Sequence, residues 1–370
     1  MKIALVHDYL NQIGGAEKVL QAFCEIWPEA PIFTLIYDRK STRDYFEGKK
    51  IYTSFLQKIP FSKRNHRFFL IFMPQAVESF DLSGYDIVLS DSASYAKGVV
   101  TGYKTLHISY CHTPLRYVWD DGQKYVNEFC FPQIIKKISS VPRSWIRIWD
   151  REAASRVDKF IANSEFVRKR IKKYYGFDSE VIYPPLNSEN FAIQKTGDYF
   201  LMVGRLLPYK RFDLAIETFN KLNWQLKIIG DGPDKKRLKK MAKDNVEFLG
   251  EITSDAELAK YYSQALAFIF PQEEDFGIVA LEAMASGRPV IAYAGGGALE
   301  TVIDGKTGIF FRDQTSEALE EAVKKFNSDD FDPGFLRQHA LQFDKEIFKQ
   351  KIKNFVEKSL MEFKNQYSNL

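Results

Sequence analysis

Cysteine is scarce in this chain of 370 residues, and long apolar runs are missing from it. The three cysteines, Cys24, Cys111 and Cys130, are scattered without Cys-x-x-Cys spacing, which argues against a disulfide framework and a zinc site and favours a reducing cytosol. No apolar run approaches the roughly 20 residues that a membrane-spanning helix needs. The N-terminus also lacks the basic and apolar regions of a signal peptide, so we expect a cytoplasmic protein.

A charge excess of one sign is missing as well. The chain has 52 Lys and Arg against 48 Asp and Glu, and a formal net charge of +4, which is too weak to indicate a nucleic-acid partner. Hydrophobic residues make up 45% and charged residues 27%, the balance of a globular protein. The length is sufficient for two domains, each with its own core.

Short apolar runs alternate with helical periods along the chain, which predicts parallel sheets covered by helices on both faces. The predicted strands are 2–7, 32–36, 86–90, 105–111, 157–162, 199–203, 225–229, 246–249, 267–270 and 290–292, and the predicted helices are 14–26, 164–175, 213–221, 234–242, 255–263 and 278–286.

Paired prolines at 184 and 185 interrupt this pattern, because proline cannot continue a helix. The fold class is therefore α/β, with two Rossmann-like, doubly wound domains. We predict the first domain over residues 1–183 and the second over 184–344. The tail, 345–370, carries apolar residues at a helical period.

Two carboxylates surround a glycine-led helix start in the second domain. Glu274 follows a predicted buried strand that ends at Pro271, and Glu282 lies eight positions later on the predicted helix. The backbone N–H groups at the start of that helix, those of Gly277, Ile278 and Val279, favour an anion such as a phosphate. Capping alone explains a single acidic residue here. Two carboxylates beside an anion site suit a nucleotide sugar, whose hydroxyls donate hydrogen bonds while its diphosphate meets the helix.

The segment from Glu274 to Glu282, which encloses Phe-Gly-Ile-Val, resembles the donor-binding signature of retaining glycosyltransferases with the GT-B fold. These are the glycosyl transferases group 1, a glycogen-synthase-like and phosphatidylinositol-mannosyltransferase-like family. The glycine-rich segment 295–308 follows at the family's usual distance, and the resemblance covers nearly the whole chain, most strongly residues 199–310. It implies a GT-B architecture of two Rossmann-like domains that face a central cleft. The first domain then binds the acceptor, the second binds the nucleotide sugar, and the tail 345–370 packs back on the first.

The same resemblance assigns Arg205 and Lys210 to the donor's diphosphate, in place of the divalent metal that other glycosyltransferases use. Fixed cations suit this task, because the departing nucleotide diphosphate gathers charge in the transition state. It further assigns Gly14 and Gly15 to a glycine loop that abuts the donor phosphates and the acceptor, and Gly250 to the loop where the nucleotide base docks. No metal and no cofactor other than the donor is expected.

His112 lies in a segment, His-Thr-Pro-Leu-Arg-Tyr-Val-Trp, that resembles the family's active-site histidine loop. This longer form is similar to mannosyltransferases of bacterial O-antigen and exopolysaccharide pathways. Arg116 in this segment contacts a phosphate or the acceptor, or packs against its aromatic neighbours. Ser164 is expected to cap a helix, and a cleft-facing role for the preceding Asn163 stays open. The remaining histidines are interpreted as structural: His7, His66, His107 and His339.

The predicted catalytic residues are His112, Arg205, Lys210 and Glu274, and the predicted donor-binding residues are Gly14, Gly15, Arg205, Lys210, Gly250, Glu274, Gly277, Ile278, Val279 and Glu282. The predicted reaction moves mannose from GDP-mannose, with retention, to a glycan or a polyprenyl-diphosphate-linked acceptor in lipopolysaccharide or exopolysaccharide biosynthesis. A UDP-sugar donor, a GT-B sugar-nucleotide epimerase and a non-catalytic binding protein are the alternatives.

Basic and aromatic residues interleave in the segment 58–73. The aromatic side chains either belong to the core or enter a membrane interface, where basic residues contribute about 1 kcal/mol each beside anionic lipid. The second interpretation predicts peripheral contact with the inner face of the cytoplasmic membrane. Its residues are Lys58, Phe61, Lys63, Arg64, Arg67, Phe68, Phe69, Ile71 and Phe72, aided by Lys136, Lys137, Arg143 and Arg147.

Overall fold

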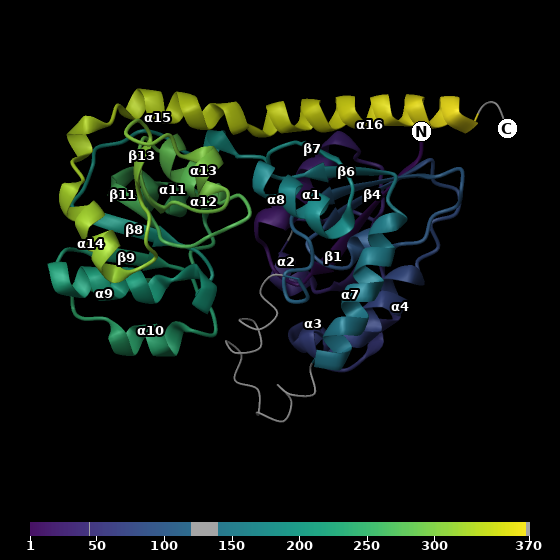
Figure 1. Ribbon diagram of the computed structural model, residues 1–370, viewed down its shortest axis with the longest axis horizontal. Helices are drawn as coiled ribbons and strands as arrows, with labels where there is room; N and C mark the ends of the chain where they lie inside the picture. The colour runs from purple at the N-terminus through teal and green to yellow at the C-terminus, as the bar shows by residue number, and fades with distance from the viewer. Residues whose placement is uncertain (44, 120–139, 368–370) are drawn as a thin grey trace. The chain divides into compact units, whose positions relative to one another are not determined.

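The computed structural model describes residues 1–43, 45–119 and 140–367, which form two compact units (Figure 1). The N-terminal unit comprises Met1–Pro185 and Phe348–Leu370, and the C-terminal unit comprises Leu186–Ile347. The first boundary falls directly after the paired prolines. The second falls near the start of the last helix, α16 (Lys345–Tyr367), so most of this helix belongs to the N-terminal unit.

The N-terminal unit contains a parallel sheet of seven strands in the order β3-β2-β1-β4-β5-β6-β7. The chain moves outward from β1 to β2 and β3 and then returns to the other side of β1, so the strand order reverses between β1 and β4. The strands are β1 (Ile3–Leu10), β2 (Ile32–Tyr37), β3 (Ile51–Thr53), β4 (Ile87–Ser92), β5 (Leu106–Cys111), β6 (Lys159–Ala162) and β7 (Ser179–Val181). The helices are α1 (Gly15–Ile26), α2 (Arg39–Thr42), α3 (Ser62–Asn65), α4 (Met73–Glu78), α7 (Ser140–Ser155) and α8 (Glu165–Tyr175), with 3-10 turns η1 (Phe55–Lys58), η2 (His66–Phe72) and η3 (Ala96–Gly98).

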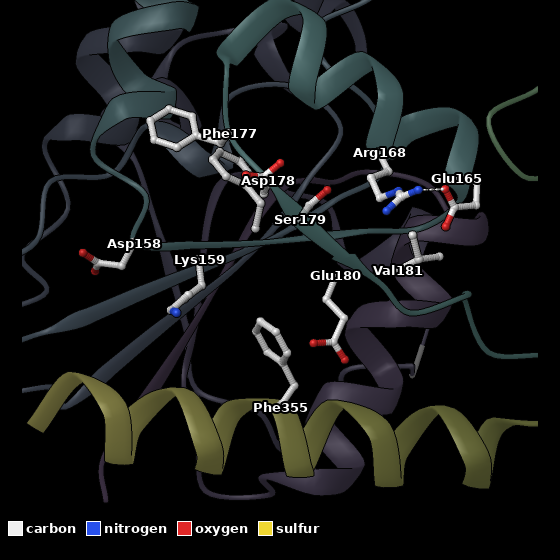
Figure 2. Close-up of a pocket in the computed structure, with 11 residues that line it drawn as sticks. Asp158, Lys159, Glu165, Arg168, Phe177, Asp178, Ser179, Glu180, Val181 and Phe355 are labelled. Carbon is white, nitrogen blue, oxygen red and sulfur yellow. Dashed lines mark ion pairs between the residues drawn. The ribbon is translucent and has the colours of Figure 1, made fainter. Parts of the chain in front are cut away.

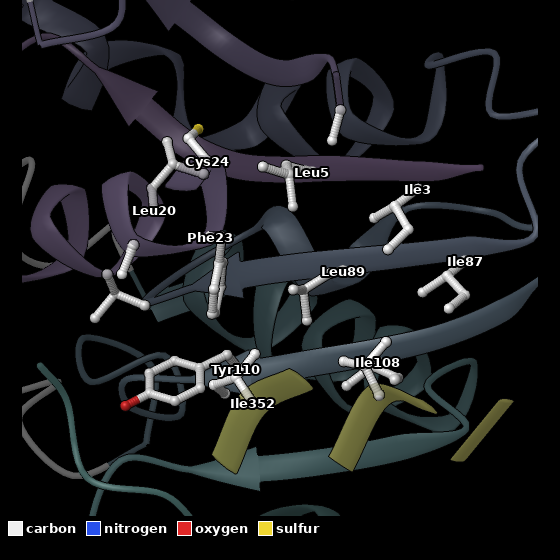
Figure 3. Packing of buried hydrophobic residues seen from close by; sticks show 14 of the residues in the cluster. Ile3, Leu5, Leu20, Phe23, Cys24, Ile87, Leu89, Ile108, Tyr110 and Ile352 are labelled. Atoms are coloured by element: carbon white, nitrogen blue, oxygen red, sulfur yellow. The ribbon is translucent and has the colours of Figure 1, made fainter. Parts of the chain in front are cut away.

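Alternate residues of β1 enter two different cores, one on each face of this sheet. Ile3 and Leu5 join a cluster that contains Phe23 from α1 (Figure 3). Phe348 from α16 belongs to the same cluster, and its ring stacks on that of Phe23 with centroids 5.8 Å apart. Ala4 and Val6 join the cluster on the other face. Full burial of one large apolar side chain contributes about 1.5–3 kcal/mol, so α16 is an integral part of the N-terminal unit.

The C-terminal unit contains a parallel sheet of six strands in the order β10-β9-β8-β11-β12-β13, and here the order reverses between β8 and β11. Its strands are β8 (Tyr199–Val203), β9 (Leu226–Ile229), β10 (Val246–Gly250), β11 (Ala265–Phe270), β12 (Val290–Tyr293) and β13 (Gly308–Phe311). Its helices are α9 (Phe212–Leu222), α10 (Lys235–Met241), α11 (Asp255–Gln264), α12 (Ile278–Ala285), α13 (Ala298–Thr301), α14 (Ser316–Lys325) and α15 (Pro333–Ala340), with 3-10 turns η4 (Ser188–Asn190), η5 (Pro208–Lys210), η6 (Ser328–Asp330) and η7 (Leu341–Phe343).

The predicted fold class is confirmed: each unit is a doubly wound parallel sheet. All predicted strands and helices occur, with ends shifted by a few residues. The short strands β3, β7 and β13 were not predicted. β3 and β7 have only three residues, too few for an alternation to be recognised.

Two cysteines in the described part of the chain, Cys24 and Cys111, are buried, and Cys130 lies outside the described residues. Within the described residues, no helix is both long enough and apolar enough to cross a membrane. The same residues contain no group of three or more His, Cys, Asp or Glu side chains that could hold a metal ion.

Candidate active site

In an open α/β sheet, ligands bind beyond the carboxyl ends of the strands where the strand order reverses. In the C-terminal unit this point lies between β8 and β11. Lys210 follows β8 and Glu274 follows β11, and the Lys210 ammonium forms an ion pair with the Glu274 carboxylate. The two side chains are 14% and 16% exposed, so solvent still reaches both groups. The structure therefore brings together two of the residues predicted from separate motifs.

Glycines hold the Glu274 loop against the loop that follows β12. Gly296 has a φ of +59°, and a Cβ atom there would lie 2.2 Å from the Glu274 carbonyl oxygen. The neighbouring Gly297 N–H donates to the same oxygen at 2.8 Å. A side chain at Gly296 would push the Glu274 backbone away, so the glycine-rich segment fixes the position of Glu274.

Helix α12 begins directly after this loop, at Ile278. Gly277 caps it with a φ of +86°, and a Cβ atom there would lie 2.6 Å from the Phe270 ring. The Ala280 N–H donates to the Gly277 carbonyl at 3.0 Å. The N–H groups of Gly277, Ile278 and Val279 precede this first turn and have no partner within the helix, which favours an anion in front of them.

Glu282 differs from Glu274 in its surroundings. It lies in the second turn of α12, is only 3% exposed, and accepts a hydrogen bond of 2.8 Å from the Tyr262 hydroxyl. Burial and the charge of Glu282 raise the pKa of Tyr262 well above its usual value, so this hydroxyl stays protonated and donates. A role for Glu282 at the ribose stays a prediction.

The other predicted donor residues of this unit lie at the same edge of the sheet. Arg205 is exposed in the loop after β8. Gly250 ends β10 with a φ of +77°, and its carbonyl accepts from the Gly230 N–H, after β9, at 2.7 Å. Gly230 in turn packs against Gly204, because a Cβ atom at Gly230 would lie 1.9 Å from the Gly204 carbonyl oxygen.

In the N-terminal unit, His112 lies directly after β5. Its Nε2 atom is 2.5 Å from one oxygen of Asp91, on β4. The other Asp91 oxygen is 2.8 Å from His7 Nδ1, and His7 Nε2 is 3.6 Å from a Glu17 oxygen on α1. A chain of four titratable side chains therefore links the histidine loop to the first turn of α1.

We call these four linked side chains the His7–Asp91 network. Three of them were not predicted as site residues from the sequence. His7 received a structural interpretation there, and Asp91 and Glu17 were not considered. His7 and Asp91 are register partners on the adjacent strands β1 and β4, at the point where the strand order reverses. Titratable residues at the carboxyl ends of two predicted strands were the signal that could have identified them.

Within the network, the pKa values of His7 and Asp91 are shifted in opposite directions. Burial lowers the pKa of His7, but hydrogen bonds and charge from Asp91 and Glu17 outweigh this and raise it to about 10. Burial raises the pKa of Asp91, whereas His112 and His7 lower it, and the net result is a pKa below the usual value. His7 is therefore protonated and Asp91 ionised at neutral pH.

The glycine loop meets this network at Glu17. Gly14 caps α1 without a side chain, and a Cβ atom there would lie 3.2 Å from the second Glu17 oxygen. Gly15 is the first residue of the helix and is exposed. The predicted glycine loop and the predicted histidine loop are thus connected through the side chains of Glu17, His7 and Asp91.

The remaining predictions for this unit concern neighbouring residues. Ser164 caps α8 as predicted, since its Oγ accepts from the Val167 N–H at 3.0 Å. Asn163 is 4% exposed and accepts from the Ser164 hydroxyl at 3.2 Å. The guanidinium of Arg147 lies over the Trp119 ring, 5.8 Å from its centroid. Both roles predicted for Arg116 stay predictions.

A cavity of about 510 Å³ lies elsewhere in the N-terminal unit, along the edge strand β7 (Figure 2). Phe177, and Phe355 from α16, contribute apolar surface to the cavity. Arg168 and Glu165 also line it and form an ion pair of 2.6 Å. None of the predicted site residues lines this cavity, so it is separate from the candidate active site.

Comparison with known proteins identifies the class that this fold and these loops define, the GT-B glycosyltransferases. The model of Glycosyltransferase Family 4 matches residues 13–190, and that of Glycosyl transferases group 1 matches residues 185–347. The chain belongs to this family of glycosyltransferases, whose members are retaining enzymes that use nucleotide-sugar donors and are typically metal-independent.

Curated relatives include two mannosyltransferases. The alpha-1,3/1,6-mannosyltransferase alg2 of Schizosaccharomyces pombe is 25% identical over 83% of this chain and 70% of its own length. The O-antigen chain mannosyltransferase RfbU of Salmonella typhimurium is 29% identical over 60% of this chain and 65% of its own length. An uncharacterized glycosyltransferase of Methanocaldococcus jannaschii is 29% identical, and the match spans 54% of this chain and 58% of that protein.

Solved structures share the fold over nearly the whole chain. HepE of Anabaena in complex with UDP-glucose has a TM-score of 0.72 and 18% identity, and the match covers 97% of this chain and 100% of that one. WaaG, a glycosyltransferase involved in lipopolysaccharide biosynthesis, has a TM-score of 0.69 and 16% identity, over 95% of this chain and 99% of that one. At this identity the likeness concerns the fold alone.

Proposed function

We propose that this protein is a retaining, metal-independent glycosyltransferase that moves mannose from GDP-mannose to a glycan or a polyprenyl-diphosphate-linked glycan in surface polysaccharide biosynthesis. The observation that carries the proposal is the meeting of Lys210 and Glu274 where the strand order reverses in the C-terminal unit. Mannose is supported by the two mannosyltransferases among the relatives and by the segment around His112.

In the proposed reaction, the bond between the anomeric carbon and the donor's phosphate oxygen breaks, and the diphosphate leaves with the bonding electrons. The acceptor hydroxyl attacks the same face of the sugar, and its proton passes to the departing phosphate oxygen. Lys210 and Arg205 stabilise the charge that collects on the diphosphate, together with the N–H groups at the start of α12. No enzymic nucleophile is needed.

Glu274 is proposed to accept hydrogen bonds from the hydroxyls of the donor sugar. In the structure its charge is balanced by Lys210. When a donor binds, the Lys210 ammonium contacts the diphosphate and the Glu274 carboxylate accepts from the sugar hydroxyls. Each charged group therefore exchanges one partner for another. This exchange avoids leaving either charge unpaired in a partly buried site, which would be costly.

The proposal is tested by measuring free nucleoside diphosphate after the purified protein is mixed with GDP-mannose, UDP-glucose or UDP-N-acetylglucosamine, with and without a lipid extract as acceptor. Release from GDP-mannose that requires the acceptor supports the proposal. Release from a UDP-sugar alone assigns a different donor. Interconversion of nucleotide sugars without acceptor indicates an epimerase, and binding without turnover indicates a binding protein.

We further propose that residues 58–73 contact the inner face of the cytoplasmic membrane. The structure divides the apolar side chains of this segment into two groups. Phe69 packs against the core, whereas Phe61, Phe68, Ile71 and Phe72 are 79%, 73%, 50% and 52% exposed. Four exposed large apolar side chains within one short segment are the reason for proposing an interaction site here.

Charge supports an anionic surface as the partner. Lys58 and Lys63 are exposed. Arg147 is engaged within the fold, where it donates to the Val118 carbonyl at 2.6 Å. Lys136 and Lys137 lie outside the described residues, as do the side chains of Arg64 and Arg67.

Helix α7 also exposes two large apolar side chains, Trp145 and Ile148, which are 47% and 65% exposed. Ile146 of the same helix belongs to the core cluster against which Phe69 packs.

Co-sedimentation with liposomes tests this contact. The wild-type protein should pellet with anionic vesicles at low salt and less at high salt, because the basic residues are screened. The double substitution F61S/F68S should reduce the pelleted fraction. F335S, which removes an exposed ring of the C-terminal unit, is the matched control and should leave it unchanged. Equal recovery of the wild type in the supernatant with anionic and neutral lipid would exclude the electrostatic contact.

A further inference from the structure

Among the described residues of the N-terminal unit, the carboxylates of Asp91 and Asp150 have no exposed surface but differ in what surrounds them. Asp150 is paired with Lys97, and its second oxygen accepts from the Trp119 indole and the Tyr175 hydroxyl, at 2.8 Å each. Lys97 is itself 1% exposed. This cluster is closed within the core and has the features of a structural network.

Asp91 is equally buried, but its network ends at the surface. One oxygen faces His7, which is 3% exposed, and the other faces His112, which is 13% exposed. His112 is the member that reaches solvent, and it lies in the loop that the sequence motif assigns to the donor sugar.

Two contacts other than the one with Asp91 hold His112, one through its backbone and one through its ring. Its N–H donates to the Ser92 carbonyl at the end of β4 at 2.8 Å, and its ring meets the edge of Tyr110 with centroids 5.2 Å apart. With the ring held in this way, the contact between Nε2 and Asp91 decides which ring nitrogen carries the proton. A carboxylate accepts, so the proton lies on Nε2 and the lone pair lies on Nδ1.

We infer that Asp91 is a positioning residue that holds His112 in the Nε2-protonated form, so that Nδ1 accepts a hydrogen bond from a sugar hydroxyl, and that His7 and Glu17 keep Asp91 in place. The inference rests on the proposed function for the identity of the ligand, but the tautomer of His112 does not depend on it. The same logic applies to the aspartate of serine-protease triads, which fixes the tautomer of a catalytic histidine.

The position of Asp91 is secured from the far side. His7 Nδ1 occupies its second oxygen at 2.8 Å, and Glu17 lies 3.6 Å from the other His7 nitrogen. His7 therefore cannot turn away without losing its contacts to both carboxylates. A free Asp91 could rotate and offer either oxygen to His112, whereas the paired Asp91 offers one.

Nuclear magnetic resonance of the ring nitrogens tests the inference without reference to activity. In ¹⁵N-histidine-labelled protein, the signals of His112 are identified by their absence from H112Q. The wild type should show a protonated Nε2 and an unprotonated Nδ1 in the pH range where His112 is neutral. An Nδ1-protonated ring in the wild type would overturn the inference, whatever the protein transfers.

Matched substitutions separate positioning from stability. D91N and D150N make the same change at two equally buried carboxylates of the same unit. D91N should populate the other tautomer of His112 and lower kcat about 10²-fold with little change in the KM for the donor, since misplacing one group costs about this much. D150N should leave the His112 signals unchanged.

Identical His112 spectra in D91N and wild type, or equal changes in D150N, would also overturn the inference. If D91N does not fold, E17Q offers a second variant at the far end of the network, where a smaller shift of the same signals is expected. A correct tautomer in a protein that releases no nucleoside diphosphate from any donor would contradict the proposed function and leave the positioning role intact.

Discussion

The two sheets each reverse their strand order once, and titratable residues lie at both reversals. They differ in how far solvent reaches them. Between β1 and β4, Asp91 is fully buried and His7 is 3% exposed. Between β8 and β11, Lys210 and Glu274 are 14% and 16% exposed. The first group is part of the packed domain and reaches solvent through His112. The second is an ion pair that solvent still reaches.

This difference separates two roles that charge takes at the same topological point. A buried charge that loses its partner is costly, because the remaining charge stays out of water. Removing one partner of a pair that water reaches costs less, because water solvates the charge that remains. Substitutions at the first reversal should therefore lower stability more than those at the second, whereas both should lower activity.

The largest effect is expected from D91A. Removing this carboxylate leaves the protonated His7 with one buried partner instead of two, and the free energy of unfolding should fall by about 3–5 kcal/mol. Urea denaturation measures this change. A D91A protein with the midpoint of the wild type would remove the distinction between the two reversals.

E274A should show the converse. Its loss of transition-state contacts should reduce transfer on the order of 10²–10³-fold, by analogy with the removal of one stabilising donor. Because water still reaches Glu274 and Lys210, the melting temperature should fall less than in D91A. Near-normal transfer by a folded E274A protein would contradict the proposed role.

R205A and K210A should each lower turnover by a smaller factor, about 10–100-fold, since a hydrogen bond to a charged group is worth about 1.5–3 kcal/mol. Added Mg²⁺ or Mn²⁺ should not restore either variant, because both cations are proposed to act in place of a metal. The control is the wild type treated with a chelator, which should keep its activity. Loss of activity on chelation would refute the metal-free mechanism.

The smallest expected effect, counted per pH unit, is the dependence of the free energy of unfolding on pH. His7 has a pKa of about 10 in the folded protein and an ordinary value of 6.5 when unfolded, so the folded state binds more protons between these values. The stabilisation from His7 is complete below pH 6.5 and is lost as the pH rises towards 10. The free energy of unfolding should decrease by at most about 1.4 kcal/mol per pH unit in this window.

Comparison with H7Q isolates this contribution. The difference in unfolding free energy between wild type and H7Q should shrink as the pH rises from 7 to 10. His107 provides the contrast, because burial lowers its pKa to about 3 and its titration falls outside this window. A difference that stays constant over the whole range would show that His7 is not protonated in the folded protein.

Much of the fold could be predicted from the sequence, because strands and helices follow from local periodicity. The prolines at 184 and 185 led us to predict a domain boundary there, and the predicted strands and helices occur close to their expected ends. Glu274, Lys210 and the glycines around them were predicted as site residues from motifs whose residues lie close together in the sequence. The same local pattern led to His112 but not to the residues that hold it.

What only the tertiary structure decided is which distant side chains meet. His7 and Asp91 are 84 positions apart and touch because β4 pairs with β1, and Lys210 and Glu274 are 64 positions apart and touch because β11 pairs with β8. The order of strands in a sheet depends on packing across the whole domain, and no local period encodes it. For the same reason, the sequence placed aromatic residues in segment 58–73, but only packing against the core decided that Phe69 is sheltered and Phe68 is exposed.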